Sequence, residues 1–247
     1  MEDLAIIGGS GLTRLHGLEI TRREVMHTPY GEPSGALTFG ALCGREVVFL
    51  ARHGYGHTIP PHMVNYRANL WALREAGATR VTAVCAVGGI RNDLQPGVIA
   101  IPDQIIDYTW SRDHTLFEKD LTAVTHIDFT EPYCGAMREQ LISAATRAGI
   151  DVITEGTYGA TQGPRLETAA EIDRLEQDGC HMVGMTGMPE ASLARELELC
   201  YAACALTANL AAGRGDGPIS MQTIEATLAA GMSSIAAILE QLLTGSD

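Results

Sequence analysis

The sequence alternates short apolar runs of strand length with helical segments, and this alternation constrains the fold more than any other feature. The clearest run is residues 80–87 (RVTAVCAV), which is continuously apolar and is typical of a central strand covered by helices on both faces. Similar runs lie at residues 4–7, 46–51 and 200–206. With no internal repeat and no linker between them, we predict a single α/β domain spanning residues 1–247.

Helical and hairpin signals fill the spaces between these runs. Residues 65–75 (NYRANLWALRE) have apolar positions three and four residues apart and end before Gly77, which predicts a helix. A second helix is expected to run to about residue 148, and a third from its N-cap Ser220 to near residue 242. Residues 20–50 read as hairpin strands joined by polar turns.

Composition excludes several classes of protein. A formal net charge of −13 and a pI near 5.0 argue against nucleic acid or an anionic membrane as the main partner. The first residues, MEDLAIIGG, do not resemble a secretory signal, and no apolar run is judged long enough to span a membrane. We expect a cytoplasmic enzyme that acts on small molecules.

The cysteines show neither a CxxC pair nor the Cys/His spacing of a metal site. Four of them lie in apolar runs and are expected to be buried free thiols: Cys85, Cys180, Cys200 and Cys204. No metal site is predicted.

Glycine-rich or polar residues follow several of the predicted strands. Residues 8–11 (GGSG) allow backbone N–H groups to approach an anion, and Ser10 adds a hydroxyl donor. A dinucleotide-binding fingerprint would need a glycine where Arg14 stands, and no P-loop lysine follows. An anion site and a plain turn at the end of the strand both remain open.

The strand at residues 46–51 ends in Arg52 and His53, and the strand at residues 200–206 is soon followed by Asn209. Arg52 could grip phosphate oxygens through its forked guanidinium, or could pair with a nearby acid instead. Asn209 could both donate to and accept from a ligand, or could simply form a turn.

Residues 162–190 carry the strongest candidate for ligand recognition. Glu167 stands near a predicted helix start, where its carboxylate could accept a hydrogen bond from a ring N–H or could only cap the helix. A short apolar strand at residues 181–184 then leads to Met185 and Thr186, before Pro189 begins another helix. A strand that ends in a small polar loop is a common ligand site in α/β proteins.

These strand ends are predicted to converge on one rim of the sheet. Hydroxyl groups, backbone N–H groups, a guanidinium and an imidazole would together form an oxyanion cradle without a set of metal ligands. Glu167 and Asn209 would supply an acceptor and a donor to a heterocycle. An anion site beside a base site indicates a reaction between phosphate and a nucleoside.

The motifs that carry this chemistry are, in chain order, IIGGSGL, RHG, HTIPPHMVNYRAN, CAVGGIRNDLQPG, HIDFTEPYC, GPRLETAAEI and GMTGMPEASLARELELCYA. Over essentially the whole chain, they resemble the purine nucleoside phosphorylase and methylthioadenosine phosphorylase family. The resemblance implies an α/β fold with a mixed central β-sheet flanked by helices. It also implies a homotrimer, which could pair into hexamers, and phosphorolysis without a cofactor, inorganic phosphate being a co-substrate.

The resemblance assigns roles to the positions that match family motifs. The family's phosphate-binding positions are matched by Ser10, Arg52, His53, Ala86 and Thr186. The ribose and purine positions are matched by Tyr66, Met185, Leu166, Glu167 and Asn209. A pocket for the 5′ substituent is expected from His57, Met221 and Ile224, while His126 lies in a segment that reaches the neighbouring subunit's site in this family. Catalytic roles fall to Asn209, His53 and Glu167.

Two departures from the methylthioadenosine phosphorylases predict the substrate. Those enzymes have an aspartate at the position of Asn209, a second acid near Ala211 and a serine at the position of Glu167. Here the Glu167–Asn209 pair resembles the pair found in the 6-oxopurine enzymes. The carboxylate can accept a hydrogen bond from the N1–H of a 6-oxopurine, which adenine lacks. Binding adenine against this carboxylate would cost about 1–3 kcal/mol. Apolar Met221 and Ile224 favour a methylthio group over a 5′-hydroxyl.

We therefore expect phosphorolysis of S-methyl-5′-thioinosine through an oxocarbenium-like state, with Asn209 stabilising the charge and proton at N7 of the leaving purine. Inosine or guanosine is the second choice of substrate, and methylthioadenosine the third. A catalytically silent nucleoside- or phosphate-binding module with the same fold is the non-enzymatic alternative.

Overall fold

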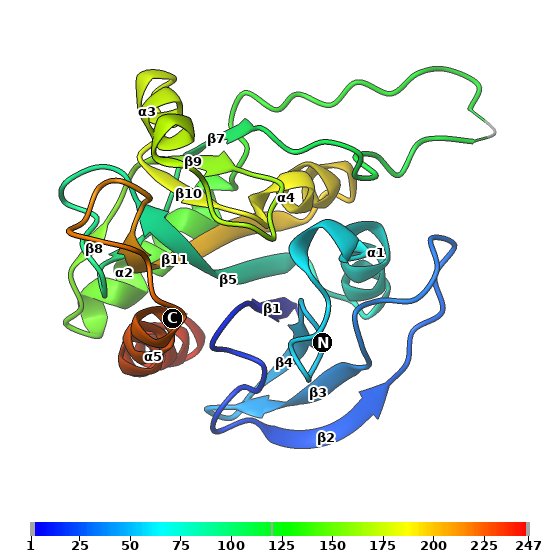
Figure 1. The fold of residues 1–247 in the computed structure, drawn as a ribbon. Helices are drawn as coiled ribbons and strands as arrows, with labels where there is room; N and C mark the ends of the chain where they lie inside the picture. The colour runs from blue at the N-terminus through cyan, green and yellow to red at the C-terminus, as the bar shows by residue number, and fades with distance from the viewer. Residues whose placement is uncertain (1–2, 120, 246–247) are drawn as a thin grey trace.

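The computed structural model of the protein describes residues 3–119 and 121–245, and eleven strands in these residues form one mixed sheet (Figure 1). The middle of the sheet is built from strands that run parallel to one another. Their pairings join β4 to β1, β1 to β5 and β5 to β11. Their bounds are β1, Leu4–Gly8; β4, Arg45–Ala51; β5, Arg80–Gly89; and β11, Cys200–Leu210.

The remaining strands extend this parallel centre in mixed directions. On one side, β2 (Glu19–Glu24) and β3 (Leu37–Leu42) continue antiparallel from β4, which confirms the predicted hairpins. On the other side, β10 (Met182–Gly184) pairs antiparallel with the end of β5 and parallel with β9 (Thr157–Ala160).

Three short strands complete the sheet. The strand β7 (Gln104–Asp107) pairs parallel with β9. The strand β6 (Ile99–Ala100) pairs antiparallel with β11 and parallel with β8 (Val152–Ile153). The expected mixed central β-sheet is therefore confirmed. That residues 1–247 form a single domain stays a prediction.

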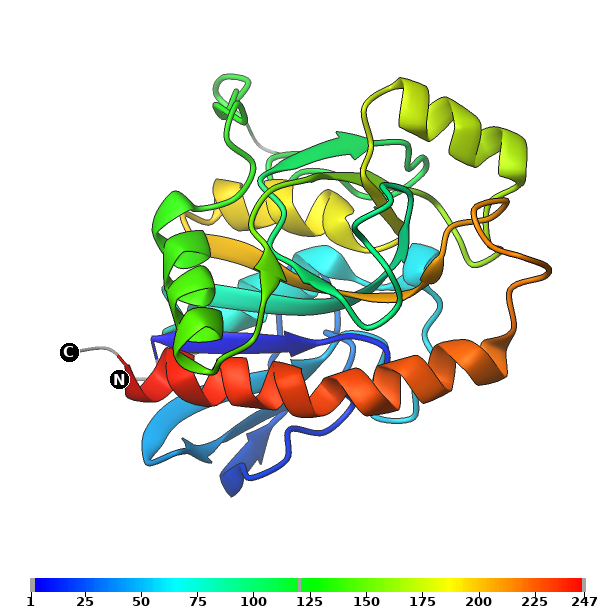
Figure 2. The ribbon, with the colours of Figure 1, turned by 90° about the vertical axis from the view of Figure 1, so that its left-hand side faces the viewer.

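Helices cover both faces of the sheet, which explains the continuously apolar strands. The helices α2 (Gly135–Arg147) and α5 (Met221–Thr244) pack together against β11, and Figure 2 shows them along one side of the sheet. The helices α1 (Tyr66–Glu75) and α4 (Gly187–Glu196) pack together on the opposite face. A 3₁₀ turn at Pro61–Met63 precedes α1, and α3 (Ala169–Gln177) follows β9.

The side-chain alternation of β1 shows how the two faces are filled. Leu4 and Ile6 belong to the apolar cluster beneath α2 and α5, whereas Ala5 and Ile7 belong to the cluster beneath α1 and α4. Successive side chains of a strand point to opposite faces of a sheet, so an apolar residue is needed at every position of β1. All four side chains are buried.

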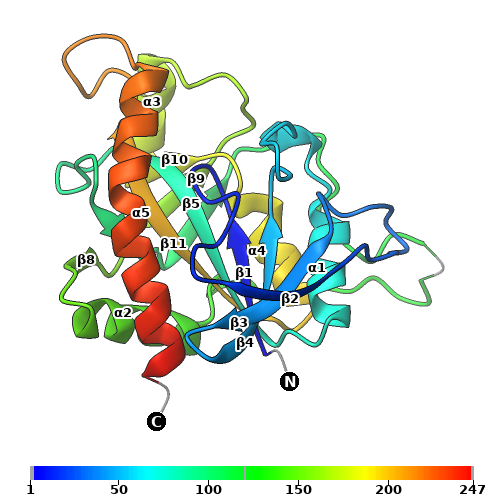
Figure 3. The ribbon, with the colours of Figure 1, turned by 90° about the horizontal axis from the view of Figure 1, so that it is seen from below.

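The C-terminal helix α5 runs alongside β11 (Figure 3). It is long and apolar enough, by length and composition, to cross a membrane, so the sequence-based judgement that no such run exists is wrong for this helix. One face of the helix packs into the core through Ile224, Leu228, Ile235, Ile238 and Leu242. The predicted N-cap is Ser220, but its side chain makes no capping hydrogen bond.

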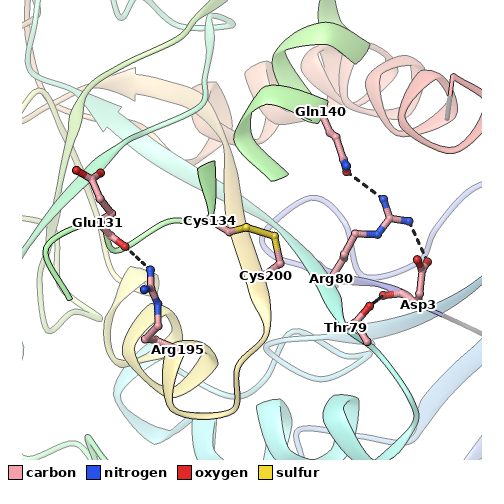
Figure 4. The surroundings of a disulfide bond; sticks show 8 residues. All are labelled: Asp3, Thr79, Arg80, Glu131, Cys134, Gln140, Arg195 and Cys200. Carbon is pink, nitrogen blue, oxygen red and sulfur yellow. Dashed lines mark hydrogen bonds and ion pairs between the residues drawn. A yellow bond between two sulfur atoms is a disulfide. The ribbon is translucent and has the colours of Figure 1, made fainter. Parts of the chain in front are cut away.

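A disulfide joins Cys134, the N-cap residue of α2, to Cys200, the first residue of β11. Their Cα atoms lie 5.1 Å apart, although 66 positions separate them in sequence. The expectation that Cys200 is a free thiol is therefore wrong, because no local spacing reveals a partner brought close by the tertiary fold. Figure 4 shows Arg80 nearby, joined to Gln140 and Asp3. The other cysteines expected to be buried and free are confirmed as such: Cys85, Cys180 and Cys204.

A long segment without helix or strand connects β7 to α2, and Figure 1 shows it projecting from the body of the protein. In the middle of its sequence, Leu121 and Val124 are exposed apolar residues, and His126 is also exposed. Near its root, Arg112 is buried, and the same segment therefore reaches from the surface into the interior.

Candidate functional site

The parallel pairing of the central strands brings several predicted site residues to one edge of the sheet. Because β1, β4, β5 and β11 run in the same direction, their carboxyl ends share an edge, called the carboxyl edge below. Ser10 follows β1, Arg52 and His53 follow β4, and Asn209 lies near the end of β11. Ala86 is within β5, three residues before its end.

Ser10, His53 and His57 form a polar cluster at this edge. The hydroxyl oxygen of Ser10 lies 3.5 Å from Nε2 of His57, and the rings of His57 and His53 are 4.8 Å apart between centroids. His53 is buried, whereas Ser10 is half-buried and His57 is exposed. The cluster therefore runs from the interior to the surface and offers both a hydroxyl and imidazole nitrogens to a ligand.

The environment of His53 keeps its imidazole neutral at physiological pH. Burial, the neighbouring Arg52 charge and nearby His57 lower the pKa of His53 to about 4, against the opposing effect of its hydrogen bond to the Ile59 carbonyl. That carbonyl oxygen lies 2.8 Å from Nδ1 and can only accept, so Nδ1 carries the proton. The lone pair of Nε2 is then free to accept a hydrogen bond from a hydroxyl group of a ligand.

Arg52 is held by a buried carboxylate. Its Nε and NH2 groups donate to the two oxygens of Glu190 at 2.7 and 2.8 Å, and NH1 donates to the Val84 carbonyl at 3.0 Å. Both side chains are almost completely buried, with 1% of Arg52 and none of Glu190 exposed. The pairing with an acid that the sequence left open is thus present. Two N–H bonds of the guanidinium are not used in these contacts and are available to an anion.

Two neighbours complete the setting of this ion pair. Tyr201 donates from its hydroxyl to Glu190 at 2.8 Å, and burial together with the Glu190 charge raises the pKa of Tyr201 well above its ordinary value. A Cβ atom at Gly9 would lie only 2.8 Å from NH1 of Arg52, so only glycine fits between β1 and the guanidinium. Arg52 is therefore positioned by α4 and β5, to which it donates, by the turn after β1, and through Glu190 by β11.

Thr186 occupies the N-cap position of α4 and is 7% exposed. It makes no side-chain capping bond, while its backbone N–H donates to the Tyr158 hydroxyl at 3.3 Å. Since β10 runs antiparallel to β5, the chain leaves β10 in the direction of Ala86 and carries Met185 and Thr186 toward the phosphate-binding candidates. The backbone at Met188 is extended rather than helical, so the regular turns of α4 begin at Pro189, as the sequence predicts.

Glu167 does not cap a helix, so this alternative from the sequence is wrong. The helix α3 begins at Ala169 and is capped by Thr168, which forms a reciprocal capping box with Glu171. Glu167 instead accepts a hydrogen bond of 2.6 Å from the hydroxyl of Thr161, at the end of β9. Its half-buried carboxylate retains further acceptor positions for a ligand.

Asn209 lies within β11 rather than in a turn, which excludes the turn-forming alternative. The register between β11 and β5 shifts between Thr207 and Asn209, so Ala208 is the extra residue of a β-bulge. Such bulges re-aim side chains beside binding sites. The Asn209 amide donates one N–H to the Leu210 carbonyl at 2.7 Å, which leaves its second N–H and its oxygen for a ligand.

Arg112 joins the segments that carry several of the predicted nucleoside-binding residues, and it was not predicted from the sequence. The residue is 9% exposed, and its guanidinium donates to backbone carbonyls of four residues: Thr161, Gln162, Met185 and Met188. It also reaches the hydroxyl of Tyr66 at 3.4 Å, and no carboxylate pairs with it among the residues that the structure describes. No local motif reveals this role, because residues 110–125 read only as a polar, irregular segment.

Tyr66 and Met185 both contact this guanidinium, Tyr66 through its hydroxyl and Met185 through its backbone carbonyl. The Tyr66 hydroxyl donates to the Pro61 carbonyl at 2.9 Å, and burial raises the pKa of Tyr66 despite the opposing Arg112 charge. The sulfur of Met185 packs against Gly163, where a Cβ atom would approach it to 2.4 Å. Both predicted ribose residues therefore contact the network around Arg112.

Four other predicted site residues lie outside these polar contacts. Leu166 is 38% and Met221 61% exposed, and His126 is exposed on the projecting segment. Ile224 is buried in the apolar cluster between α5 and the sheet. The structure does not bring His126 or Met221 into contact with the polar cluster. The role of Met221 in the 5′ pocket and that of His126 in a neighbouring subunit's site therefore stay predictions. Residues 3–119 and 121–245 contain no group of three or more metal-ligating side chains.

Comparison with known proteins places this geometry in a family. Residues 3–244 match the model of the phosphorylase superfamily. The chain belongs to this superfamily. Its membership confirms the resemblance to nucleoside phosphorylases and the enzyme class expected from the sequence.

Individual relatives of this phosphorylase cover nearly its whole length. A probable S-methyl-5′-thioinosine phosphorylase of Pseudomonas syringae pv. tomato is 54% identical over 242 residues, or 98% of each chain. A 6-oxopurine nucleoside phosphorylase of Pyrococcus furiosus is 50% identical over 218 residues, which are 86% of this chain and 81% of that one.

The fold is also similar to that of solved structures along the whole chain. Methylthioadenosine phosphorylase from Schistosoma mansoni, in complex with adenine, superimposes with a TM-score of 0.95 and 32% identity. The match covers 100% of this chain and 93% of that one. The fold class predicted from the sequence is thus confirmed at the level of the whole chain.

Proposed function

We propose that this phosphorylase cleaves S-methyl-5′-thioinosine with inorganic phosphate and releases hypoxanthine and 5-methylthioribose 1-phosphate. The observation that carries the proposal is the carboxylate of Glu167, held on the nucleoside side of the site by Thr161. A 6-oxopurine has an N1–H to donate to this carboxylate, whereas adenine presents only a lone pair there. The probable S-methyl-5′-thioinosine phosphorylases among the relatives support this choice, at 46–54% identity over at least 97% of the chain for three of them.

Asn209 supplies the complementary group. Its free N–H can donate to O6 of the same base, and its amide oxygen can accept a hydrogen bond from N7 once that nitrogen is protonated. As the bond to the sugar breaks, negative charge collects on the purine, and the donor at O6 together with the proton at N7 stabilises that charge. Asn209 thus assists departure of the base, and Glu167 holds the base in the correct orientation.

Phosphate is the nucleophile in the proposed mechanism. The free N–H bonds of Arg52 and the hydroxyl groups of Ser10 and Thr186 would bind its oxygens, with the backbone near Ala86 on the same edge. Neutral His53 would accept a hydrogen bond at Nε2 from a phosphate hydroxyl group. Attack at the anomeric carbon then passes through an oxocarbenium-like state, which the adjacent dianion stabilises electrostatically.

A second candidate substrate is a 6-oxopurine nucleoside with an ordinary 5′-hydroxyl, inosine or guanosine. The 50% identity to the 6-oxopurine nucleoside phosphorylase of Pyrococcus furiosus favours it. Both candidates use the same base contacts and differ only at the 5′ position. The apolar side chains of Met221 and Ile224, at the start of α5, support the methylthio group.

We also infer a homotrimer, in which the projecting segment of one subunit packs on its neighbour. The exposed apolar side chains of Trp110, Leu121 and Val124 on that segment support this assembly. Pairing of trimers into hexamers and a cytoplasmic location both stay predictions.

Base release from four nucleosides, with and without phosphate, tests the proposed function. The panel contains methylthioinosine, inosine, guanosine and methylthioadenosine. We expect phosphate-dependent release that is most efficient, by kcat/KM, with methylthioinosine. A preference for methylthioadenosine would refute the base assignment, a preference for inosine the assignment of the 5′ group, and equal release without phosphate the reaction type. No release at all would support the silent binding module.

A further inference from the structure

Thr161 lies where β9 ends, directly beside the carboxylate proposed to read the base. Its hydroxyl oxygen is 2.6 Å from Oε1 of Glu167 and 3.3 Å from the backbone carbonyl of Gly184. A threonine hydroxyl has a single proton and can donate fully to only one of these acceptors. The much shorter distance, and the greater strength of hydrogen bonds to charged groups, assign that proton to Glu167.

This contact sets what Glu167 offers to a ligand. A hydroxyl that donates to Oε1 uses the carboxyl group as an acceptor and restricts its rotation, because Oε1 must stay near the end of β9. The second oxygen, Oε2, is then presented as an acceptor in a fixed direction. An acceptor in this position suits a ring N–H and is mismatched to a ring lone pair.

Thr161 can impose this orientation because its own backbone is held on both sides. Its N–H donates to the Gly184 carbonyl at 2.8 Å, which continues the pairing of β9 with β10. Its carbonyl accepts from NH2 of Arg112 at 3.2 Å, and the next carbonyl, that of Gln162, accepts from the same nitrogen at 2.8 Å. The hydroxyl therefore projects from a rigid strand end rather than from a mobile loop.

We propose that Thr161 is a positioning residue that determines specificity for the 6-position of the purine by acting through Glu167. This inference rests on the proposed function, since it assumes that Glu167 contacts the base. It assigns part of the discrimination between 6-oxopurines and 6-aminopurines to a hydroxyl that does not itself contact the substrate. Thr161→Val removes the donor and keeps the side-chain shape, whereas Thr161→Ser keeps the donor.

The quantity to measure is the ratio of kcat/KM for methylthioinosine to kcat/KM for methylthioadenosine, at saturating phosphate. We expect Thr161→Val to lower this ratio about tenfold and Thr161→Ser to keep it within about threefold of the unmodified enzyme. Thr157→Val is the matched control: it makes the same chemical change on β9, at a residue whose backbone N–H pairs with His181, and should leave the ratio unchanged.

A double-mutant cycle tests whether Thr161 acts through Glu167. In a Glu167→Gln background, adding Thr161→Val should change the ratio by less than about twofold. An equal drop in both backgrounds would overturn the inference, as would an unchanged ratio in the Thr161→Val enzyme. Thermal unfolding and the KM for phosphate should match the unmodified enzyme within error; if Thr161→Val fails to fold, the Thr161→Ser and Thr161→Ala ratios decide, and equal values refute the role of the hydroxyl.

The unmodified enzyme separates this inference from the proposed function. If the unmodified enzyme does not cleave methylthioinosine in the presence of phosphate, the proposed function fails, whatever the Thr161 variants do. If it does so with a high ratio that Thr161→Val leaves intact, only the inference about Thr161 fails.

Discussion

Replacement of Glu190 by glutamine tests the foundation of the phosphate side of the site. Glu190→Gln keeps the shape of the side chain but removes the negative charge that faces the Arg52 guanidinium. It also places an amide N–H₂ where the guanidinium and the Tyr201 hydroxyl both donate. At least one donor then loses its acceptor, in a place where water cannot replace it, because none of the Glu190 side chain is exposed.

The size of the effect follows from burial. Removing one partner of a buried ion pair costs about 3–5 kcal/mol, because the other charge stays buried without compensation. For a chain of 247 residues, each kcal/mol lowers the unfolding temperature by about 2–4 °C. Glu190→Gln should therefore lower the unfolding temperature by about 6–20 °C. The loss of about 3–5 kcal/mol is a large fraction of the free energy of unfolding of an ordinary domain, which is about 5–15 kcal/mol.

The assay is thermal unfolding, followed by circular dichroism, with and without excess phosphate. Asp173→Asn is a suitable control, because the Asp173–Arg214 pair is largely exposed on its acidic side and should contribute about 1 kcal/mol at most. Phosphate should restore more stability to the Glu190→Gln variant than to the unmodified protein, since the anion can supply the missing negative charge to Arg52. A loss of less than about 1 kcal/mol in the variant would refute this reasoning.

Three further predictions follow from single residues. The pKa of His53 is lowered to about 4 from 6.5, so its contribution to stability is complete above pH 6.5 and is lost toward pH 4. Because of this group, the free energy of unfolding measured in urea should be about 2 kcal/mol lower at pH 5 than at pH 7. The His53→Gln variant should lack this part of the pH dependence. Cys134→Ser should lower the free energy of unfolding by about 4 kcal/mol, because it opens a loop with a sequence separation of 66. Asn209→Asp should shift kcat/KM by about tenfold toward 6-aminopurines, measured with methylthioinosine and methylthioadenosine.

Each of these predictions has an outcome that contradicts it. An unchanged pH dependence in the His53→Gln variant would mean that other groups control stability between pH 5 and pH 7. Equal stability of the Cys134→Ser variant and the unmodified protein would show that packing alone holds α2 against β11. Unchanged relative kcat/KM in the Asn209→Asp variant would remove Asn209 from base discrimination.

The central strands and the edge they share could be predicted from the sequence. Continuous apolar runs identify β1, β4, β5 and β11 because each strand has to fill two faces. Polar or glycine-rich ends after such runs identify Ser10, Arg52 and His53, since these residue types at a strand end serve a ligand or a tight turn. Periodicity likewise predicts α1 and α5 to within a few residues.

Contacts that join distant segments could not be predicted in this way. The Arg52–Glu190 pair spans 138 positions, and nothing near Glu190 indicates which cation it meets. The Cys134–Cys200 disulfide and the contacts of Arg112 are similar cases, because all depend on how α2, α4 and the projecting segment pack. Glu167 illustrates the opposite error: its place near a helix suggested a cap, but Thr168 takes that role one residue later.

The projecting segment, residues 108–134, has two parts that differ in how well they should tolerate insertions and deletions: one around Arg112 and one around Val124. Around Arg112, one guanidinium binds oxygen atoms of residues 66, 161–162 and 185–188, so a shift of even one residue there would break several buried contacts at once. Around Val124, exposed side chains make few demands on the backbone. An insertion, affinity tag or fluorescent reporter near residue 124 should therefore leave the folding of one subunit intact but block the proposed trimer, whereas shortening the segment beside Arg112 would break contacts inside the subunit.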